Sequence, residues 1–475
     1  MMTTRTTARR LAAVTGVCAL AALLPATTAG ARTAPPSGTE RVSVTAEGAQ
    51  ADDGSSGAAI SADGRYVAFD SDASDLVPGD TNGRSDVFVK DLRTGAVERV
   101  NVASDGTQAN SWSSTPSLSA DGRYVAFASD AANLVPGDTN ADTDIFVHDR
   151  RTGRTESVTL DGRPPQGRQG NQMPVISANG RYVAFASSRE DLVPGDTNGA
   201  QDIFVRDRRT GTVTRVSVSV TGGEQAAGPS ASPVISYDGR KVGFISKASN
   251  LPPKSAQAAR QEAEQRRPHS YPFFPHDLDT GRTSVASLSS AGEPVGAWNA
   301  SLSPDGRYAI FSSQYGEVVP GHPTGRPDLF VRDLVKGTTE QMSRTHDGKQ
   351  PLTGSSGLGV LSADNRRLYF QSSSPDLVPG DTNGAQDIFV RDLRTGTVER
   401  VSVATDGTQA QGYSSSASTD ATGRLVAFDS DAADLVPGDT NGVTDVFVRR
   451  VGPQARGHGH SAALPIHLEG ATMYQ

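Results

Sequence analysis

Residues 61–69 of the chain read S-A-D-G-R-Y-V-A-F, and close variants of this stretch return six more times along the sequence. The later copies begin at Ser119, Ser177, Ser236, Ser303, Ser362 and Thr419. Successive copies are 57 to 59 residues apart, except for one step of 67 residues in the fourth unit. A fixed period of this length predicts a repeat architecture of seven units, with an insertion of about ten residues in the fourth.

Each unit contains four short runs with the composition of β-strands. In the first complete unit these runs are residues 117–119, 123–128, 144–149 and 155–160, and turn sequences separate them. The chain of 475 residues contains 50 Gly and 28 Pro, which excludes long helices over most of its length and favours short strands. Four strands per unit, repeated seven times, predict an all-β fold, a seven-bladed β-propeller of four-stranded antiparallel blades.

The period alone leaves a parallel β-helix or an array of separate sandwiches as alternatives. The coils of a β-helix are shorter, and a unit of this size with such short strands cannot enclose its own core. The chain ends favour a closed ring, because residues 40–45 repeat the fourth run of the sixth unit at 399–403, whereas the seventh unit stops after 445–448. We therefore expect the N-terminal strand to complete the last blade of a propeller spanning residues 40–451.

The repeat also resembles a known family of propeller repeats. The pattern S-x-D-G-R-x-V-A-F, followed by D-I-F-V-x-D and a T-G turn, is similar to the TolB-like, WD-repeat-like repeat over roughly residues 40–450. The resemblance implies the propeller fold but selects no single function, because this repeat occurs in protein-binding modules, peptidase gate domains and enzymes. TolB-like proteins bind other proteins of the cell envelope, which implies a comparable kind of partner here.

The first 31 residues have the pattern of a secretory signal peptide. Three arginines precede an apolar run at residues 11–24, and A-G-A at residues 29–31 supplies a small-x-small cleavage site. The apolar run contains 14 residues, which is shorter than the ~20 that a membrane-spanning helix needs. We therefore predict a secreted bacterial protein without a membrane span, in which residues 32–39 are a linker and residues 452–475 a disordered tail.

Composition excludes several classes of site. Cys18 is the only cysteine and lies inside the predicted signal peptide, so disulfides and cysteine-based sites are not expected in the mature chain. The formal net charge is −8, and loss of the three arginines of the signal peptide makes the chain more acidic still. An acidic protein is a poor match for nucleic acid, so no nucleic-acid partner is predicted. We expect a monomer.

The connections between strands divide the predicted propeller into two unlike faces. The turns from strand one to two and from three to four lie on one face, here named the short-turn face. The connections from strand two to three and from strand four to the next blade lie on the other, the long-loop face, and contain ten or more residues. Because binding residues are usually carried by loops on a rigid scaffold, we place the ligand site on the long-loop face near the central channel.

Five long loops carry a carboxylate, an amide and a carboxylate at positions i, i+2 and i+6. These residues are Asp80, Asn82 and Asp86; Asp138, Asn140 and Asp144; Asp196, Asn198 and Asp202; Asp381, Asn383 and Asp387; and Asp439, Asn441 and Asp445. Such oxygens are ligands that Ca²⁺ accepts, and the loop resembles a shortened form of the calcium loops of integrin-type propellers. The same residues also stabilise tight turns through their own backbone, so the predicted cofactor is Ca²⁺ or none.

The fourth and fifth units depart from this pattern. Residues 252–275 replace the loop of the fourth unit, and the helical composition of 255–267 fits either a solvated insertion or a lid over the channel. In the fifth unit a histidine replaces the first aspartate of the loop. The ligand-face candidates in these two units are His269, Tyr271, Trp298, His322 and His346.

These observations predict a secreted, non-enzymatic binding or scaffold propeller that engages an envelope or extracellular protein, or a glycan, through its long-loop face. The alternative is a secreted polysaccharide lyase or hydrolase, which would require His269, His322 and His346 to lie within about 5 Å of a common point. The sequence contains no G-x-S-x-G elbow, no H-E-x-x-H motif and no nucleotide-binding glycine loop. Binding is therefore the preferred hypothesis.

Overall fold

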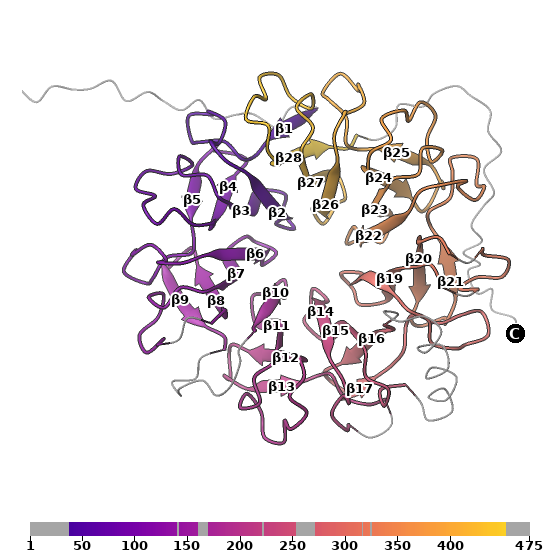
Figure 1. Ribbon diagram of the computed structural model, residues 1–475, viewed down its shortest axis with the longest axis horizontal. Helices are drawn as coiled ribbons and strands as arrows, with labels where there is room; N and C mark the ends of the chain where they lie inside the picture. The colour runs from indigo at the N-terminus through magenta and orange to yellow at the C-terminus, as the bar shows by residue number, and fades with distance from the viewer. Residues whose placement is uncertain are drawn as a thin grey trace, which may run out of the picture.

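The computed structural model describes residues 38–139, 142–159, 170–220, 223–252, 271–315, 317–323 and 325–452. Within these ranges, 28 strands form seven four-stranded antiparallel sheets arranged as blades around a central axis (Figure 1). This confirms the predicted all-β, seven-bladed β-propeller. The predicted signal peptide, residues 253–270 of the blade 4 insertion and residues 453–475 of the predicted C-terminal tail lie outside the described residues.

Each blade runs from an inner strand at the channel to an outer strand at the rim. Blade 1 consists of β2 (Ser55–Ile60), β3 (Tyr66–Ser71), β4 (Asp86–Asp91) and β5 (Val97–Arg99). Blade 2 consists of β6 (Ser113–Leu118), β7 (Tyr124–Ser129), β8 (Asp144–Asp149) and β9 (Arg154–Ser157). Blade 3 consists of β10 (Gln172–Ile176), β11 (Tyr182–Ser187), β12 (Asp202–Asp207) and β13 (Val213–Arg215). Blade 4 consists of β14 (Ser230–Ile235), β15 (Lys241–Ser246), β16 (Phe273–Asp277) and β17 (Arg282–Thr283).

The remaining blades follow the same order. Blade 5 consists of β18 (Trp298–Leu302), β19 (Tyr308–Ser313), β20 (Asp328–Asp333) and β21 (Thr339–Gln341). Blade 6 consists of β22 (Ser356–Leu361), β23 (Arg367–Ser372), β24 (Asp387–Asp392) and β25 (Val398–Arg400). Blade 7 consists of β26 (Ser414–Thr419), β27 (Leu425–Ser430), β28 (Asp445–Arg450) and β1 (Thr39–Arg41). Within the described residues, no helix is long and apolar enough to cross a membrane.

The N-terminal strand closes the ring, as predicted. β1 pairs antiparallel with β28, with Thr39 opposite Arg449 and Arg41 opposite Phe447, and Figure 1 shows the indigo β1 beside the yellow β28. Ser43, just after β1, donates a hydrogen bond from its Oγ to Asp445 Oδ1 at 2.6 Å. The two ends of the described chain therefore meet in blade 7.

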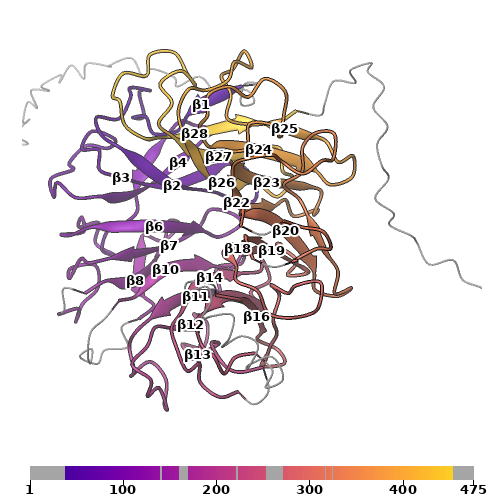
Figure 2. The same cartoon turned by 45° about the vertical axis from the view of Figure 1, so that its right-hand side comes forward.

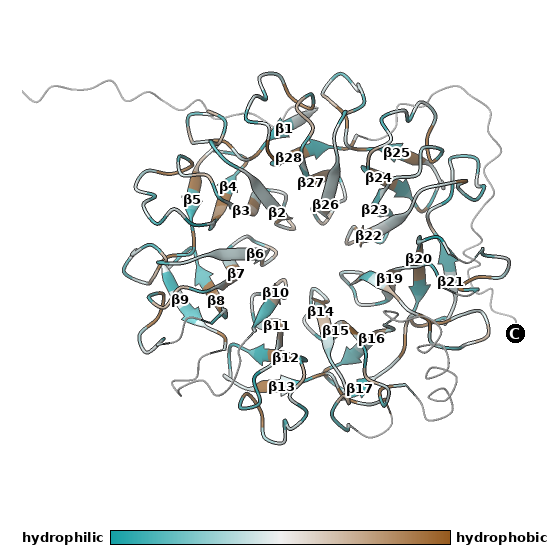
Figure 3. Ribbon diagram, viewed as in Figure 1, coloured by the Kyte–Doolittle hydropathy of each residue, from teal (hydrophilic) through white to brown (hydrophobic). Residues whose placement is uncertain are grey.

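The apolar core is divided into layers between neighbouring blades. In every blade a phenylalanine of the second strand stacks on one of the third, as Phe69 does on Phe88 with ring centroids 5.9 Å apart. The layer containing Phe69 is completed by Ala427 and Val446 of blade 7. Figure 2 shows such neighbouring sheets packed face to face, and Figure 3 shows hydrophobic and hydrophilic residues mixed in all seven blades.

The inner strands are longer than the sequence pattern indicated. The first run of the example unit was predicted at 117–119, but β6 begins at Ser113. Its register shifts between Ser114 and Ser117 because a β-bulge interrupts it. A bulge breaks the two-residue alternation, which hides the first half of the strand from pattern analysis.

Backbone hydrogen bonds link neighbouring blades on the short-turn face. The amide of Ala178 donates to Tyr237 O at 3.0 Å, and the amide of Tyr237 donates to Pro304 O at 2.8 Å. Pro304 has no amide hydrogen, so blade 5 cannot continue the series to blade 6. At that boundary Asn365 Nδ2 donates instead to Asp305 Oδ2 at 2.7 Å. The scaffold on this face is therefore tied across blade boundaries.

Candidate functional site

A left-handed residue lies in the bulge of every inner strand. The backbone φ angle is +43° to +57° at Thr115, Met173, Ser232, Asn299, Leu358 and Ser416, and +71° at Gly57. This conformation costs roughly 1–2 kcal/mol for a residue with a Cβ atom. The inner strands begin on the long-loop face, so the seven bulges surround the channel at that end. Strained backbone of this kind is typical of functional sites.

Two of these bulges bind carboxylates of the preceding blade through their amides. Asp429 of β27 accepts hydrogen bonds from the amides of Gly57 and Ala58 at 3.1 and 3.2 Å. Asp70 of β3 accepts one from the amide of Thr115 at 3.3 Å. Burial raises the pKa of Asp429 to about 6, with a further contribution from the charge of Asp70, and burial also raises the pKa of Asp70. Sequence analysis did not identify this acidic pair, in which Asp429 is buried and Asp70 is half-buried.

Exposed apolar side chains gather on the long-loop side. Among the described residues, six large hydrophobic side chains are exposed, and the only one on the short-turn face is Val335. The other five are Trp112, Met173, Leu352, Leu358 and Tyr413, with Trp112 at 56% and Tyr413 at 61% exposure. They lie in fourth-to-first loops or in the first half of an inner strand. A cavity of about 310 Å³ opens between Trp112 and Met173.

The predicted residues Tyr271 and Trp298 lie near one another on the same face. Tyr271 forms an isolated bridge with Ala297, the residue before Trp298. The Trp298 ring lies 5.4 Å from that of Tyr315, with a tilt of 50°. Lys247 Nζ lies 5.1 Å from the centre of the Tyr271 ring. The structure therefore places an aromatic cluster with one cation at the long-loop side of blades 4 and 5.

The predicted histidines occupy unlike environments. His322 is buried, its Nε2 bonds to Asp328 Oδ2 at 2.8 Å, and its ring lies edge-on to Phe330 at 5.1 Å. His346 is exposed, and its backbone amide donates a hydrogen bond to Leu377 O at 3.0 Å. His269 lies outside the described residues. In the part of the chain that is described, no group of three or more His, Cys, Asp or Glu side chains is arranged to hold a metal ion.

The carboxylates of the predicted calcium loops form ion pairs with arginine. In blade 1, Arg99 Nη1 lies 3.3 Å from Asp80 Oδ2 and 3.1 Å from Asp86 Oδ2. Gln108 Nε2 donates to both carboxylates at 2.9 Å. Asn82 presents its amide nitrogen to Asp86 at 3.1 Å, while its oxygen accepts from a backbone amide. We name this group of side chains the loop cluster.

The loop cluster recurs in three further blades with the same types of residue. Arginine pairs with loop aspartates in blades 3, 6 and 7 through Arg215, Arg400 and Arg41. The glutamines are Gln225, Gln409 and Gln50. Sequence analysis missed both partners, although an R-V-[NS]-V run followed by a glutamine accompanies the loop in these four units. The Ca²⁺ hypothesis stays a prediction, and in these four blades a guanidinium already supplies positive charge to the same oxygens.

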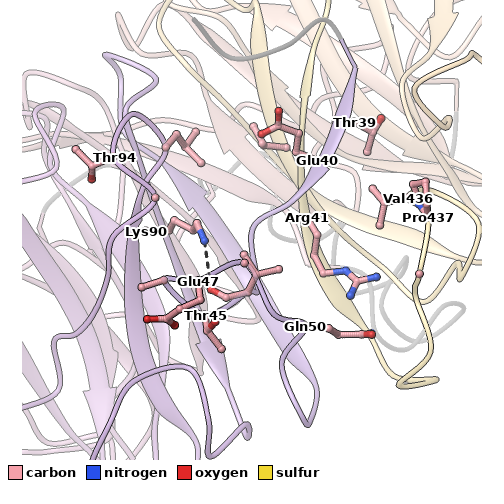
Figure 4. A pocket seen from close by; sticks show the side chains of 17 residues that line it. Thr39, Glu40, Arg41, Thr45, Glu47, Gln50, Lys90, Thr94, Val436 and Pro437 are labelled. Carbon is pink, nitrogen blue, oxygen red and sulfur yellow. Dashed lines mark hydrogen bonds between the residues drawn. The ribbon is translucent and has the colours of Figure 1, made fainter. Parts of the chain in front are cut away.

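A groove of about 600 Å³ lies between blades 7 and 1, at the ring closure (Figure 4). Both acidic and basic residues line it, including Glu40, Glu47 and Arg41. Lys90 Nζ donates to Val44 O at 3.2 Å, which is the bond drawn in Figure 4. No aromatic side chain lines the groove. It therefore offers less apolar contact than the opening of the channel on the long-loop face, which we name the long-loop mouth.

Comparison with known proteins places the chain among propellers. A scan against protein-family models finds no match, and a search of curated proteins finds none either. An oligogalacturonate lyase in complex with manganese gives a TM-score of 0.52 at 14% identity, covering 87% of this chain and 93% of that one. The oligogalacturonate lyase of Vibrio parahaemolyticus gives 0.51 at 13% identity, with the same coverage of 87% and 93%.

TolB proteins are also among the similar solved structures. TolB from Acinetobacter baumannii is 14% identical, with a TM-score of 0.36 over 82% of this chain and 81% of that one. At these identities the likeness shows the propeller fold alone.

Proposed function

We propose that this protein is a secreted, non-enzymatic binding module that holds an envelope or extracellular protein, or a glycan, at the long-loop mouth of its channel. The observation that carries the proposal is the unequal distribution of exposed apolar side chains, five on the long-loop side against one on the short-turn face within the described chain. Trp112 and Met173 line one cavity of this face, and exposed apolar side chains gathered at a cavity are typical of binding sites on soluble proteins. The strained bulges beside it add a second reason to place function there.

A capture experiment tests this proposal. Immobilised mature protein is incubated with the medium and envelope extract of the native culture, with and without EDTA. The variant W112A/W298A/Y413A removes three aromatic rings of the long-loop mouth, and V335A removes the exposed apolar side chain of the opposite face. We expect the triple variant to lose the captured ligand and V335A to keep it. Equal capture by both variants would contradict the proposed site.

The enzyme alternative has its own test. His322 and His346 do not form a shared site with other ligating side chains in the described residues, and His269 falls outside them. Incubation of the protein with oligogalacturonate, with and without Mn²⁺, tests the activity that the names of two similar structures suggest. We expect no unsaturated product. Product formation above a heat-inactivated control would refute the non-enzymatic part of the proposal.

A further inference from the structure

At two equivalent positions of the second-to-third-strand loops, carboxylates occur on one side of the ring only. Five carboxylates occupy two equivalent positions in three adjacent blades, the first and the third residue after the second-strand phenylalanine. They are Asp70 and Asp72 of blade 1, Asp130 of blade 2, and Asp429 and Asp431 of blade 7. Blades 3 to 6 have no carboxylate at either position, and blade 4 has Lys247 there. β15, which ends just before Lys247, lies across the ring from β27 (Figure 1).

Three of these carboxylates, Asp70, Asp72 and Asp429, interact electrostatically. The charge of Asp72 contributes to the raised pKa of Asp70, and the charge of Asp70 contributes to the raised pKa of Asp429, in both cases after burial. Asp72 and Asp431 are exposed, so they are the members that a ligand can reach. A negative patch of this kind attracts cationic groups and disfavours anionic ones.

Two exposed aromatic rings border the same carboxylates. The amide of Asp130 donates to Trp112 O at 2.9 Å, and the amide of Asp431 donates to Tyr413 O at 3.1 Å. Each ring is therefore carried on backbone that is hydrogen bonded to an acidic residue. We name the five carboxylates together with Trp112 and Tyr413 the acidic arc.

One of the two rings already lies against a cation of the chain itself. The guanidinium carbon of Arg84 lies 5.6 Å from the centre of the Trp112 ring. In the corresponding loop of blade 6, the residue equivalent to Arg84 is Ala385, so Tyr413 lacks this arginine. An aromatic face beside carboxylates binds guanidinium or ammonium groups through cation–π and ionic attraction together. Tyr413 therefore offers to a ligand the contact that Trp112 makes with Arg84.

We propose that the acidic arc docks a basic segment of a partner polypeptide, with an arginine or lysine against Tyr413 and basic side chains paired with Asp72 and Asp431. The inference rests on the proposed function and specifies its partner as a protein with exposed basic residues. Charge complementarity selects this occupant over an anionic glycan, which the five carboxylates would repel. Lys247 lies on the opposite side of the ring, and its positive charge repels basic residues. The basic part of the partner segment is therefore directed toward the acidic arc.

A labelled peptide measures the docking directly. The probe is a fluorescein-labelled 12-residue peptide of alternating arginine and serine, and the matched control replaces arginine with glutamate. We expect the full mature protein to increase the anisotropy of the arginine peptide only, with affinity falling as salt rises. D72N/D431N is expected to weaken binding about tenfold and Y413A about fivefold. An unchanged affinity in D72N/D431N would overturn the proposal.

Two controls separate the arc from the general acidity of the chain. D279N removes an exposed carboxylate of the short-turn face, and V335A removes an exposed apolar side chain there. Both are expected to bind the peptide as the wild type does, and a loss in D279N equal to that in D72N/D431N would mean non-specific attraction and refute docking at the arc. Asparagine can still accept the bond from the Tyr413 amide that Asp431 Oδ1 accepts at 2.6 Å, so folding is retained.

The same variants distinguish this inference from the proposed function. If W112A/W298A/Y413A loses the ligand captured from the native culture but D72N/D431N keeps it, the long-loop mouth binds a ligand that is not held by basic residues, and only this inference fails. If neither variant loses the ligand, both fail. Loss in both variants, with an arginine- or lysine-rich protein in the wild-type eluate, supports both.

Discussion

Blades 1 and 5 build the same loop cluster from different charges. In blade 1, Arg99 pairs with Asp80 and with the aspartate that begins the third strand. In blade 5, His322 stands in the position of Asp80, and Gln341 stands in the position of Arg99. Blade 5 therefore has neither the acidic residue nor the basic residue that blade 1 has at these two positions. What both blades keep is a buried aspartate at the start of the third strand with a positive or hydrogen-bonding partner.

The exchange changes the environment of that aspartate. Asp328 of blade 5 has a lowered pKa because hydrogen bonds from His322 and Arg326 outweigh the effect of burial. Its equivalents in blades 3, 6 and 7 have raised pKa values because burial outweighs their partners. These equivalents are Asp202, Asp387 and Asp445. Different residues can therefore serve as the partner of the aspartate that begins the third strand. Which residue pairs with it determines whether its pKa is raised or lowered.

Removing the arginine of blade 1 should have the largest effect. R99Q leaves Asp80 and Asp86 buried without their cation, and we expect a loss of roughly 3 kcal/mol in the free energy of unfolding. Adding D80H to R99Q reproduces the residues of blade 5 and should recover at least half of the loss. Denaturant unfolding measures both, with R93Q on an exposed turn as the control. A loss that D80H does not recover would refute the equivalence of the two clusters.

The reverse change in blade 5 should lower the free energy of unfolding by a smaller amount. H322D places a second buried carboxylate beside Asp328, where Arg326 still contributes a charge at 2.9 Å. We expect a loss of about 2 kcal/mol, and recovery when Q341R is added. The same unfolding experiment measures it. H346D, at an exposed position, serves as the matched control and should change stability by less than about 0.5 kcal/mol.

The pH dependence of stability should separate the two clusters by its sign. A raised pKa in the folded state stabilises the protein at low pH, and this contribution is lost as pH rises through the folded pKa. Asp387 is of this kind, whereas the contribution of Asp328 is lost as pH falls through its lowered pKa. Between about pH 3 and about pH 7, D387N should therefore gain stability relative to the wild type and D328N should lose it.

Each of these pH effects should be less than about 1.4 kcal/mol, the equivalent of one pKa unit. Unfolding free energies of the three proteins at both pH values provide the measurement. D279N, which removes an exposed carboxylate, controls for the general effect of losing one negative charge. The same sign for D387N and D328N would contradict the assigned environments.

The smallest expected effect is that of Ca²⁺. Each of four loop clusters already contains an arginine that pairs with its carboxylates. Ca²⁺ should therefore bind weakly, with a dissociation constant on the order of 1 mM, and should raise the melting temperature by about 1 °C. R99Q removes the competing cation in one blade and should increase the Ca²⁺-dependent shift. Calorimetric titration and thermal unfolding test this. No heat and no shift in either protein would refute the Ca²⁺ hypothesis.

The repeat made the fold predictable, because a period near 58 residues, the turn residues and the matching chain ends all depend on local sequence. The inner strand was underestimated because residues such as Thr115 adopt a conformation that their side chains disfavour. No propensity indicates a left-handed threonine. In the structure its amide donates a hydrogen bond to Asp70, a residue of the preceding blade.

The candidate site was predictable in part. The long-loop face and the residues Tyr271 and Trp298 followed from loop length and residue type. The partners of Asp80 and Asp86 did not, because Arg99 and Gln108 come from outside the loop and only the folded blade joins them. The contacts of Asp429 with the next blade cross the ring closure, so they join residues at opposite ends of the sequence.

The pairing of β1 with β28 also sets the order in which the chain can finish folding. Arg449 bonds to Thr39 across a separation of 410 residues, so β1, the first described strand, must wait during synthesis for β28, the last described one. Closing a loop of this length costs about 3 kcal/mol more than closing a hairpin of about 15 residues. Until synthesis reaches Arg450, β1 has no partner strand, and the seventh blade is the last to gain its full set of hydrogen bonds.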